Sequence, residues 1–103
     1  MGIYCVSKAG EHCLAQVLAY ELGKDNIRVN VLAPGSTRTN MTRSSLEYDN
    51  AKIEKTIIGR TALGRIADLE DMLGVALFLA SDPGRFVTGQ TLAVDGGAVT
   101  CLY

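Results

Sequence analysis

The chain has 103 residues and a mass of 11.0 kDa, so it holds one domain at most. Its 10 basic and 11 acidic side chains give a formal net charge of −1, which argues against nucleic-acid binding because no excess of positive charge can neutralise phosphates. Apolar residues make up 48% and charged residues 20%, which excludes a disordered chain. The longest apolar runs, such as residues 75–80, are too short to cross a membrane, and we expect no membrane partner.

Cysteine usage points to a reducing compartment. Cys5, Cys13 and Cys101 form no Cys-x-x-Cys pair, and their odd number argues against a disulfide framework or a zinc site. We therefore expect a cytoplasmic protein without a metal. His12, the only histidine, is expected to be an ordinary residue of a helix surface.

The first predicted element is a helix over residues 3–22. Apolar side chains recur there at helical spacing, at Val6, Cys13, Leu14, Val17 and Leu18. Ala9 and Gly10 make this face flat, and such a face usually packs closely against another helix. Gly23 is expected to end the helix in the left-handed conformation.

A strand is predicted over residues 27–33, where apolar and polar side chains alternate until Pro34-Gly35 stops the pattern. Residues 36–65 are polar and mixed, with a loop at 37–40 and one or two short helices around Leu46, Ile53, Ile57 and Ile58. Short amphipathic helices between polar loops are typical of a mobile lid. The arginines at positions 38, 43, 60 and 65 are expected to be solvated or ion-paired, with binding of an anionic substrate as the alternative.

A second clear helix is predicted over residues 69–81, with Asp68 as N-cap and Asp71 at the third helical position. Its expected buried side consists of Leu69, Met72, Leu73, Ala76, Leu77 and Ala80. A short strand follows at 91–95. The Asp95-Gly96-Gly97 sequence after it is either a hairpin turn into residues 99–102 or, as we favour, a strand end followed by a tail.

The order strand, helix, strand predicts parallel pairing across a crossover. Two short strands make a poor sheet, and parallel sheets are normally covered by helices on both faces. We therefore expect the 103 residues to be one piece of a larger α/β fold, or to fold only by association.

Chemistry-bearing residues occur near the start of the chain. Tyr4 and Lys8 are spaced i and i+4, which places them on one face of the predicted helix. A cation beside a phenol favours the phenolate, and a tyrosine tuned in this way can exchange a proton with a substrate oxygen near neutral pH. By itself this spacing is weak evidence, because it arises often, and an ordinary surface pair is its default interpretation.

Several short motifs follow this pair in order: Asn-Val-Leu-Ala-Pro-Gly at 30–35, Thr39, Gly-Arg-Ile-Ala at 64–67, Phe-Leu-Ala-Ser-Asp at 78–82, Val-Thr-Gly-Gln at 87–90 and Val-Asp-Gly-Gly at 94–97. With Tyr4-x-x-x-Lys8 before them, they make the chain resemble the C-terminal part of a short-chain dehydrogenase/reductase. The resemblance extends from about residue 2 to about residue 97. It implies the C-terminal portion of a doubly wound, parallel-sheet Rossmann fold, with residues 1–103 as a partial domain of that type.

The resemblance also implies a function. Members of this family bind NAD or NADP and move a hydride between the nicotinamide and a carbonyl or secondary alcohol carbon of a small molecule. Tyr4 matches the general acid and base of the family. Lys8 matches the residue that promotes ionisation of that tyrosine and contacts the nicotinamide ribose.

Further positions match the cofactor and substrate regions of the family. Pro34 and Gly35 match a loop beside the nicotinamide, and Thr39 matches a hydroxyl residue that holds the carboxamide or the phosphates. Thr37 stands where the family usually has Val or Ile and acts through its backbone. Residues 36–65 match the substrate lid, and the intact protein is implied to be a homodimer or homotetramer.

Two family features have no counterpart in the sequence. No glycine-rich nucleotide loop opens a helix, because Gly96 and Gly97 follow the last strand. The catalytic serine of the family is also unmatched, since Ser7 lies inside the Tyr4–Lys8 motif. An alternative is therefore a non-catalytic, truncated fragment that only associates with full-length subunits. A small α/β domain with a chance match to the motifs is the third interpretation. The sequence specifies neither the substrate nor the choice between NAD and NADP.

Overall fold

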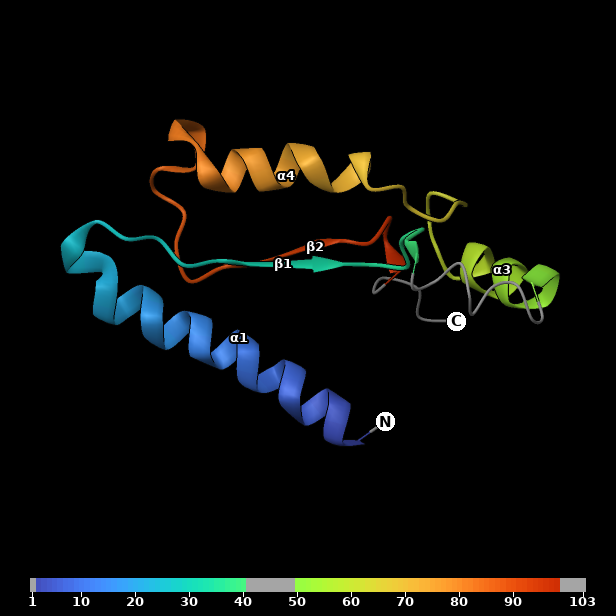
Figure 1. Ribbon diagram of the computed structural model, residues 1–103, viewed down its shortest axis with the longest axis horizontal. Coiled ribbons are helices and arrows are strands. Elements are labelled where there is room, and N and C mark those ends of the chain that lie inside the picture. Colours follow the sequence, from blue (N-terminus) through green and yellow to red (C-terminus); the bar gives the residue numbers. More distant parts are fainter. Residues whose placement is uncertain (1, 41–49, 99–103) are drawn as a thin grey trace. The chain divides into compact units, whose positions relative to one another are not determined.

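A computed structural model describes residues 2–40 and 50–98 of the chain (Figure 1). Its elements are, in order, α1 Gly2–Leu22, the short 3-10 helix η1 Gly23–Asp25, β1 Val31–Pro34, α3 Asn50–Gly59, α4 Glu70–Ala80, the 3-10 helix η2 Asp82–Gly84 and β2 Thr91–Val94. The predicted order of helices and strands is confirmed. One of the short helices expected within residues 36–65 is α3, whereas Leu46 lies outside the described residues.

The chain divides into two compact units, which we describe separately. The first unit contains residues 1–32 and 76–92, and the second contains residues 33–75 and 93–103. The division passes through both strands and through α4. Helix α1 belongs entirely to the first unit, and α3 belongs entirely to the second.

The two strands pair in parallel, as predicted. The Val31 N–H donates to the Gln90 carbonyl at 2.8 Å, and the Gly35 N–H donates to the Val94 carbonyl at 3.0 Å. From the first of these bonds to the second, the residue number rises by four on each strand, so the strands run in the same direction. The chain between them supplies the crossover that a parallel pair requires.

Strand β1 begins at Val31, four residues later than the strand predicted over 27–33, so this boundary is wrong. Side chains take part in the pairing of the segment before it. The Val29 N–H donates to the Thr88 hydroxyl at 3.1 Å, and the Gln90 N–H donates to the Asn30 side-chain oxygen at 3.0 Å. Together with a backbone bond from the Gly89 N–H to the Val29 carbonyl at 2.7 Å, these side-chain bonds hold the two segments together where a regular ladder is absent.

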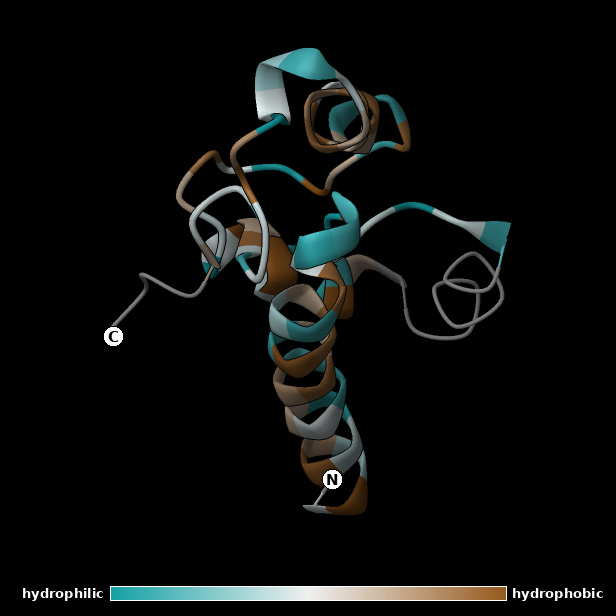
Figure 2. Ribbon diagram, turned by 90° about the vertical axis from the view of Figure 1, so that its left-hand side faces the viewer, coloured by the Kyte–Doolittle hydropathy of each residue, from teal (hydrophilic) through white to brown (hydrophobic). Residues whose placement is uncertain are grey.

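Helix α1 confirms the predicted helix but not its packed face. Its buried residues are Ala15 and Ala19, whereas Val6, Leu14 and Val17 are exposed. Small side chains allow close approach there: a Cβ placed on Gly89 would lie only 3.4 Å from the Ala19 Cβ. Leu18 of the predicted face is half-buried, whereas its other members are exposed. Figure 2 shows that hydrophobic residues recur along α1.

The C-terminal cap predicted at Gly23 is wrong. Gly23 continues the helical path into η1, and Asn26 adopts the left-handed conformation instead, with φ 60°. The Asn26 N–H donates to the Gly23 carbonyl at 3.0 Å. Asparagine tolerates this conformation better than most residues, because its short polar side chain can hydrogen-bond locally.

Helix α4 is apolar, but its expected buried side is exposed. Met72 is half-buried, whereas Leu69, Leu73, Ala76, Leu77 and Ala80 all face solvent. The half-buried side of the helix is formed by Met72, Val75 and Leu79, which are spaced three and four residues apart. Both sides of this helix are therefore apolar, and the described residues cover only one of them.

The start of α4 is held by an ion pair in the second unit. The Arg65 guanidinium contacts both oxygens of the Asp71 carboxylate, at 2.6 and 2.7 Å. The same carboxylate accepts the Asp68 N–H at 2.8 Å, which is the return bond of the predicted cap. Asp71 lies on the side of α4 opposite to the exposed leucines, and the pair joins residue 65 to the helix.

The turn after β2 is a strand end with two left-handed glycines. Gly96 and Gly97 have φ values of 61° and 83°, and the Gly97 N–H donates to the Asp95 side chain at 2.9 Å. The Leu63 N–H donates to the Gly96 carbonyl at 3.0 Å, so this turn also anchors the segment after α3. The hairpin alternative falls on residues 99–102, outside the described residues.

We predict that Gly96→Ala destabilises the chain more than Gly64→Ala. Both glycines have φ near 60°, so an alanine at either position lowers the free energy of unfolding by about 1 kcal/mol because of the left-handed conformation. At Gly96 the new Cβ would also lie 2.7 Å from Cγ2 of Thr61, whose hydroxyl is bonded to the Ile57 carbonyl, while Gly64 has open space. Urea unfolding should show an extra cost of about 1–2 kcal/mol for Gly96→Ala. Equal midpoints would contradict this packing.

We also predict that Asp71 makes the stability of the chain sensitive to acid. The Arg65 guanidinium, followed by the Asp68 N–H, holds the pKa of the Asp71 carboxyl far below its usual range. The stabilisation is therefore complete above the ordinary aspartate pKa of about 4 and is lost as the pH falls below it. Asp71→Asn should lower the urea midpoint at pH 7 and flatten its decline between pH 5 and 2. The exposed Asp25→Asn is the control, and parallel pH profiles for wild type and Asp71→Asn would refute the assignment.

Candidate active site

Tyr4 and Lys8 lie on one face of α1 in the first unit. The Lys8 Nζ is 5.9 Å from the centroid of the Tyr4 ring, within the range of a cation–π contact. The Tyr4 side chain is 64% exposed, so its hydroxyl can reach a bound molecule. The helical spacing seen in the sequence thus brings the phenol and the ammonium group together, which the proposed chemistry requires.

Lys8 has a second partner that sequence reasoning missed. Its Nζ donates to both carboxylate oxygens of Glu11, at 2.8 and 2.9 Å. The hydrogen bond and the negative charge of Glu11 raise the pKa of the Lys8 ammonium, which further favours its charged form. The spacing of i and i+3 was a signal for this pair, because side chains three residues apart are neighbours on a helix.

The other predicted site residues form one loop in the second unit. Pro34 ends β1, and Gly35 follows it where the chain passes very close to Asp95. A Cβ on Gly35 would lie 2.6 Å from the Asp95 Cα, so this position accepts no side chain. Gly35 is therefore required by the packing of the loop itself, whether or not a cofactor lies beside it.

Backbone contacts hold the rest of this loop in place. Thr37 forms an isolated parallel bridge with Ala67, in which the Ala67 N–H donates to the Ser36 carbonyl and the Arg38 N–H donates to the Ala67 carbonyl. The Thr37 hydroxyl donates to the Gly35 carbonyl at 3.0 Å. Thr37 and Thr39 are both half-buried. The role expected of Thr37, to act through its backbone, suits a residue whose main chain is held in this way.

The structure therefore places the predicted residues in two groups. Tyr4 and Lys8 are neighbours on α1 in the first unit, and Pro34, Gly35, Thr37 and Thr39 lie in one loop of the second unit. Residues are brought together within each group. Their roles in catalysis and cofactor binding stay predictions.

A cavity of about 230 Å³ lies elsewhere in the second unit. Its polar lining includes Ser36, Thr61, Arg65, Asp71 and Asp95. None of the predicted catalytic or cofactor-binding residues lines it, and Arg65 and Asp71 already satisfy each other. Through Ser36 this cavity adjoins the 34–39 loop.

Other kinds of site find no support in the part of the chain that the structure describes. No group of three or more His, Cys, Asp or Glu side chains could hold a metal ion among residues 2–40 and 50–98. Cys5 and Cys13 are free thiols there, and Cys101 lies outside these ranges. No helix in the described residues is both long and apolar enough to span a membrane.

Comparison with known proteins identifies the family. The family model described as Enoyl-(Acyl carrier protein) reductase matches residues 1–99 of the chain. A 3alpha-hydroxysteroid dehydrogenase of Mediterraneibacter gnavus is 46% identical over 95 residues, which are 92% of this chain and 36% of that protein. The chain belongs to the short-chain dehydrogenase/reductase family, as its motifs indicated.

Solved structures agree with this assignment. A gluconate 5-dehydrogenase from Burkholderia cenocepacia J2315, in complex with NADP and tartrate, is similar with a TM-score of 0.88 and 33% identity, over 96% of this chain and 38% of that chain. A 4-hydroxyisoleucine dehydrogenase complexed with NADH is similar with a TM-score of 0.87 and 33% identity, over 94% of this chain and 39% of that chain. The fold is part of a Rossmann fold, and the chain spans less than two-fifths of the length of each of these proteins.

We predict that Glu11→Gln lowers the pKa of the Lys8 ammonium. The amide keeps the size of the side chain but removes the charge and the carboxylate acceptor that raise this pKa. NMR titration of lysine Cε signals measures the change directly. Glu21→Gln, on the same helix, is the control and should leave Lys8 unchanged. An unaltered Lys8 titration in Glu11→Gln would show that the ion pair does not persist in solution.

Proposed function

We propose that the chain carries the acid–base part of an oxidoreductase that transfers a hydride between a nicotinamide cofactor and a carbonyl or secondary alcohol. The observation that carries this proposal is the contact between Tyr4 and Lys8 on an accessible face of α1, in a member of the short-chain dehydrogenase/reductase family. A phenol next to a persistent cation is suited to exchange protons with a substrate oxygen.

The residues present fit the ribose end of a nicotinamide dinucleotide. The exposed Tyr4 hydroxyl can donate or accept a hydrogen bond, and the Lys8 ammonium can donate up to three. Both groups could therefore hold ribose hydroxyls. By its resemblance to the family, the loop at 34–39 matches the segment that lies beside the nicotinamide. When bound, the cofactor supplies or accepts the hydride.

The chain's own residues handle the proton. In reduction, the Tyr4 hydroxyl gives its proton to the substrate oxygen as the carbonyl carbon gains a hydride. In oxidation, the Tyr4 oxygen takes the proton from the substrate hydroxyl. The Lys8 ammonium, whose pKa is raised by Glu11, stabilises the negative charge that develops on the Tyr4 oxygen.

The kinds of ligand named for related proteins support this reading. The gluconate 5-dehydrogenase was crystallised with NADP and the 4-hydroxyisoleucine dehydrogenase with NADH, and the first relative is named for a hydroxysteroid. We propose NAD or NADP as cofactor and a small hydroxyl- or carbonyl-bearing molecule as substrate. Residues 36–65, including α3, would form the part that faces the substrate.

We propose that the intact protein is a cytoplasmic homodimer or homotetramer. Its exposed apolar side chains support association, and they include Leu73 at 63%, Leu77 at 69% and Phe86 at 100% exposure. The same observation favours the second candidate function, in which the chain is not catalytic and only associates with full-length subunits through these surfaces.

Cofactor titration separates the two candidates. NADPH and NADH are added to the purified chain while cofactor fluorescence is followed, and the mass of the particle is measured by sedimentation. Binding of either cofactor supports the oxidoreductase. Absence of binding together with self-association, or with association to an added full-length relative, supports the second candidate.

We predict that Tyr4→Phe lowers turnover of a ketone by about 100-fold or more, because it removes the proton donor and keeps the ring. Tyr20→Phe is the matched control, since Tyr20 lies on the same helix and is 90% exposed. The control should retain full activity, and both variants should keep the circular dichroism of the wild type. Turnover that persists in Tyr4→Phe would show that another group moves the proton.

A further inference from the structure

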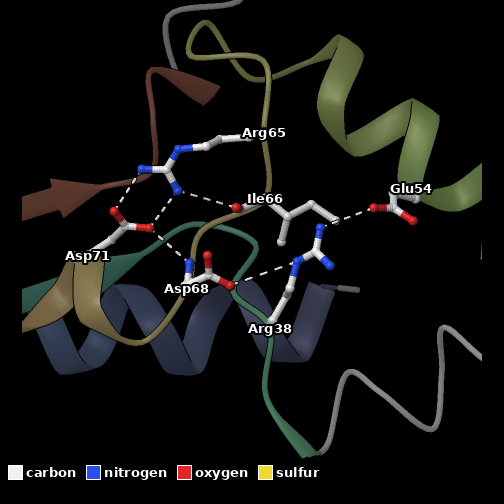
Figure 3. Close-up of polar contacts among 6 residues, drawn as sticks. All are labelled: Arg38, Glu54, Arg65, Ile66, Asp68 and Asp71. Atoms are coloured by element: carbon white, nitrogen blue, oxygen red, sulfur yellow. Dashed lines mark hydrogen bonds and ion pairs between the residues drawn. The ribbon is translucent and has the colours of Figure 1, made fainter.

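Arg38 connects three segments of the second unit. It lies between Thr37 and Thr39, and its side chain reaches two carboxylates from different elements (Figure 3). Its Nη2 donates to the Glu54 Oε1 of α3 at 3.1 Å, and its Nε lies 3.9 Å from the Asp68 Oδ1, just before α4. No other side chain in the described residues links α3 to the 34–39 loop through an ion pair.

The backbone at Arg38 gives this side chain a fixed base. The Arg38 N–H donates to the Ala67 carbonyl at 2.8 Å, which fastens the loop to the segment before α4. Ile66, one of the few buried side chains of the described residues, lies beside the ion pairs in Figure 3. The guanidinium therefore extends from a backbone that this hydrogen bond fixes in place. Its contact with Glu54 is the one that joins α3 to the loop.

The guanidinium suits this task better than an ammonium group would. Different nitrogens of the same planar group face Glu54 and Asp68, whereas a lysine would present one nitrogen to both. The side chains of Arg38 and Glu54 are 56% and 39% exposed, so the pair adds little to global stability. Its consequence is the orientation of α3 relative to the loop.

We propose that Arg38 is a positioning residue that sets the placement of α3 against the 34–39 loop and thereby the affinity for the substrate. This proposal rests on the proposed function, in which the loop lies beside the nicotinamide and α3 faces the substrate. Because the described contacts of Arg38 are to Glu54, Asp68 and the Ala67 backbone, its loss is expected to change substrate binding and to leave the chemical step intact. The position is a determinant of specificity that acts through α3.

The contact itself is tested by amide hydrogen exchange of residues 50–59, which needs no activity. Arg38→Gln and Glu54→Gln should each speed exchange in α3 by about threefold. The double variant should exchange no faster than Arg38→Gln alone, because both substitutions remove the same contact. Arg60→Gln is the matched control: it removes the same charge near α3, and Arg60 forms no ion pair with the described residues. Equal effects of Arg38→Gln and Arg60→Gln, or additive effects in the double variant, would overturn the proposal.

The consequence for the substrate is tested by steady-state kinetics on the same variants. Arg38→Gln and Glu54→Gln should raise the KM of a ketone substrate by about threefold to fivefold while kcat stays within about twofold. In wild type, 0.5 M NaCl should raise KM toward the value of the variants, and it should leave the variants almost unchanged. An unchanged KM in variants whose α3 exchanges faster would overturn the role in substrate affinity. A wild-type chain without turnover would instead refute the proposed function, while the exchange experiment would still decide whether Arg38 holds α3.

Discussion

Parallel pairing of β1 and β2 is the constraint on which the other features depend. It brings residues 31–35 next to residues 90–94, although more than fifty residues separate them along the chain. The carboxyl ends of both strands then meet, so close that a Cβ on Gly35 would lie 2.6 Å from the Asp95 Cα. Position 35 therefore has no room for a side chain, and the left-handed turn at Gly96, which anchors Leu63, lies at the same end of the strands.

Local helix geometry accounts for the pairing of Tyr4 with Lys8. Tyr4, Lys8 and Glu11 lie within two turns of α1, so their contacts require only that the helix forms. Glu11 has a double effect, because it raises the pKa of Lys8 and also accepts hydrogen bonds from its ammonium group. In the proposed function, a bound ribose would share the Lys8 hydrogen bonds with Glu11.

The described residues form a small core and leave large apolar faces of the helices exposed. Among the described residues only Ala15, Ala19 and Ile66 are buried apolar side chains, and the mean hydropathy of the chain is +0.17. Both α1 and α4 carry apolar side chains that the described residues do not cover. Relatives of the same family are more than twice as long as this chain, and a full Rossmann fold covers both faces of its sheet with helices. Such faces are covered in a full fold of this kind, whereas the described residues leave them exposed here.

The amino-acid sequence by itself determined the order of elements, the parallel pairing, the family and the spacing of Tyr4 and Lys8. These features depend on periodicity and on short motifs, whose physical causes act over a few residues. The boundary of β1, the cap at Asn26 and the exposed side of α4 were decided by tertiary structure. The side chains of Asn30 and Thr88 form hydrogen bonds with backbone N–H groups of a distant segment, which no local sequence pattern reveals. Which side of a helix is buried likewise depends on the segments that pack against it. The link from Arg38 to Glu54 and Asp68 likewise appeared only when distant segments met, because an ion pair between them requires the fold to bring their charges within reach.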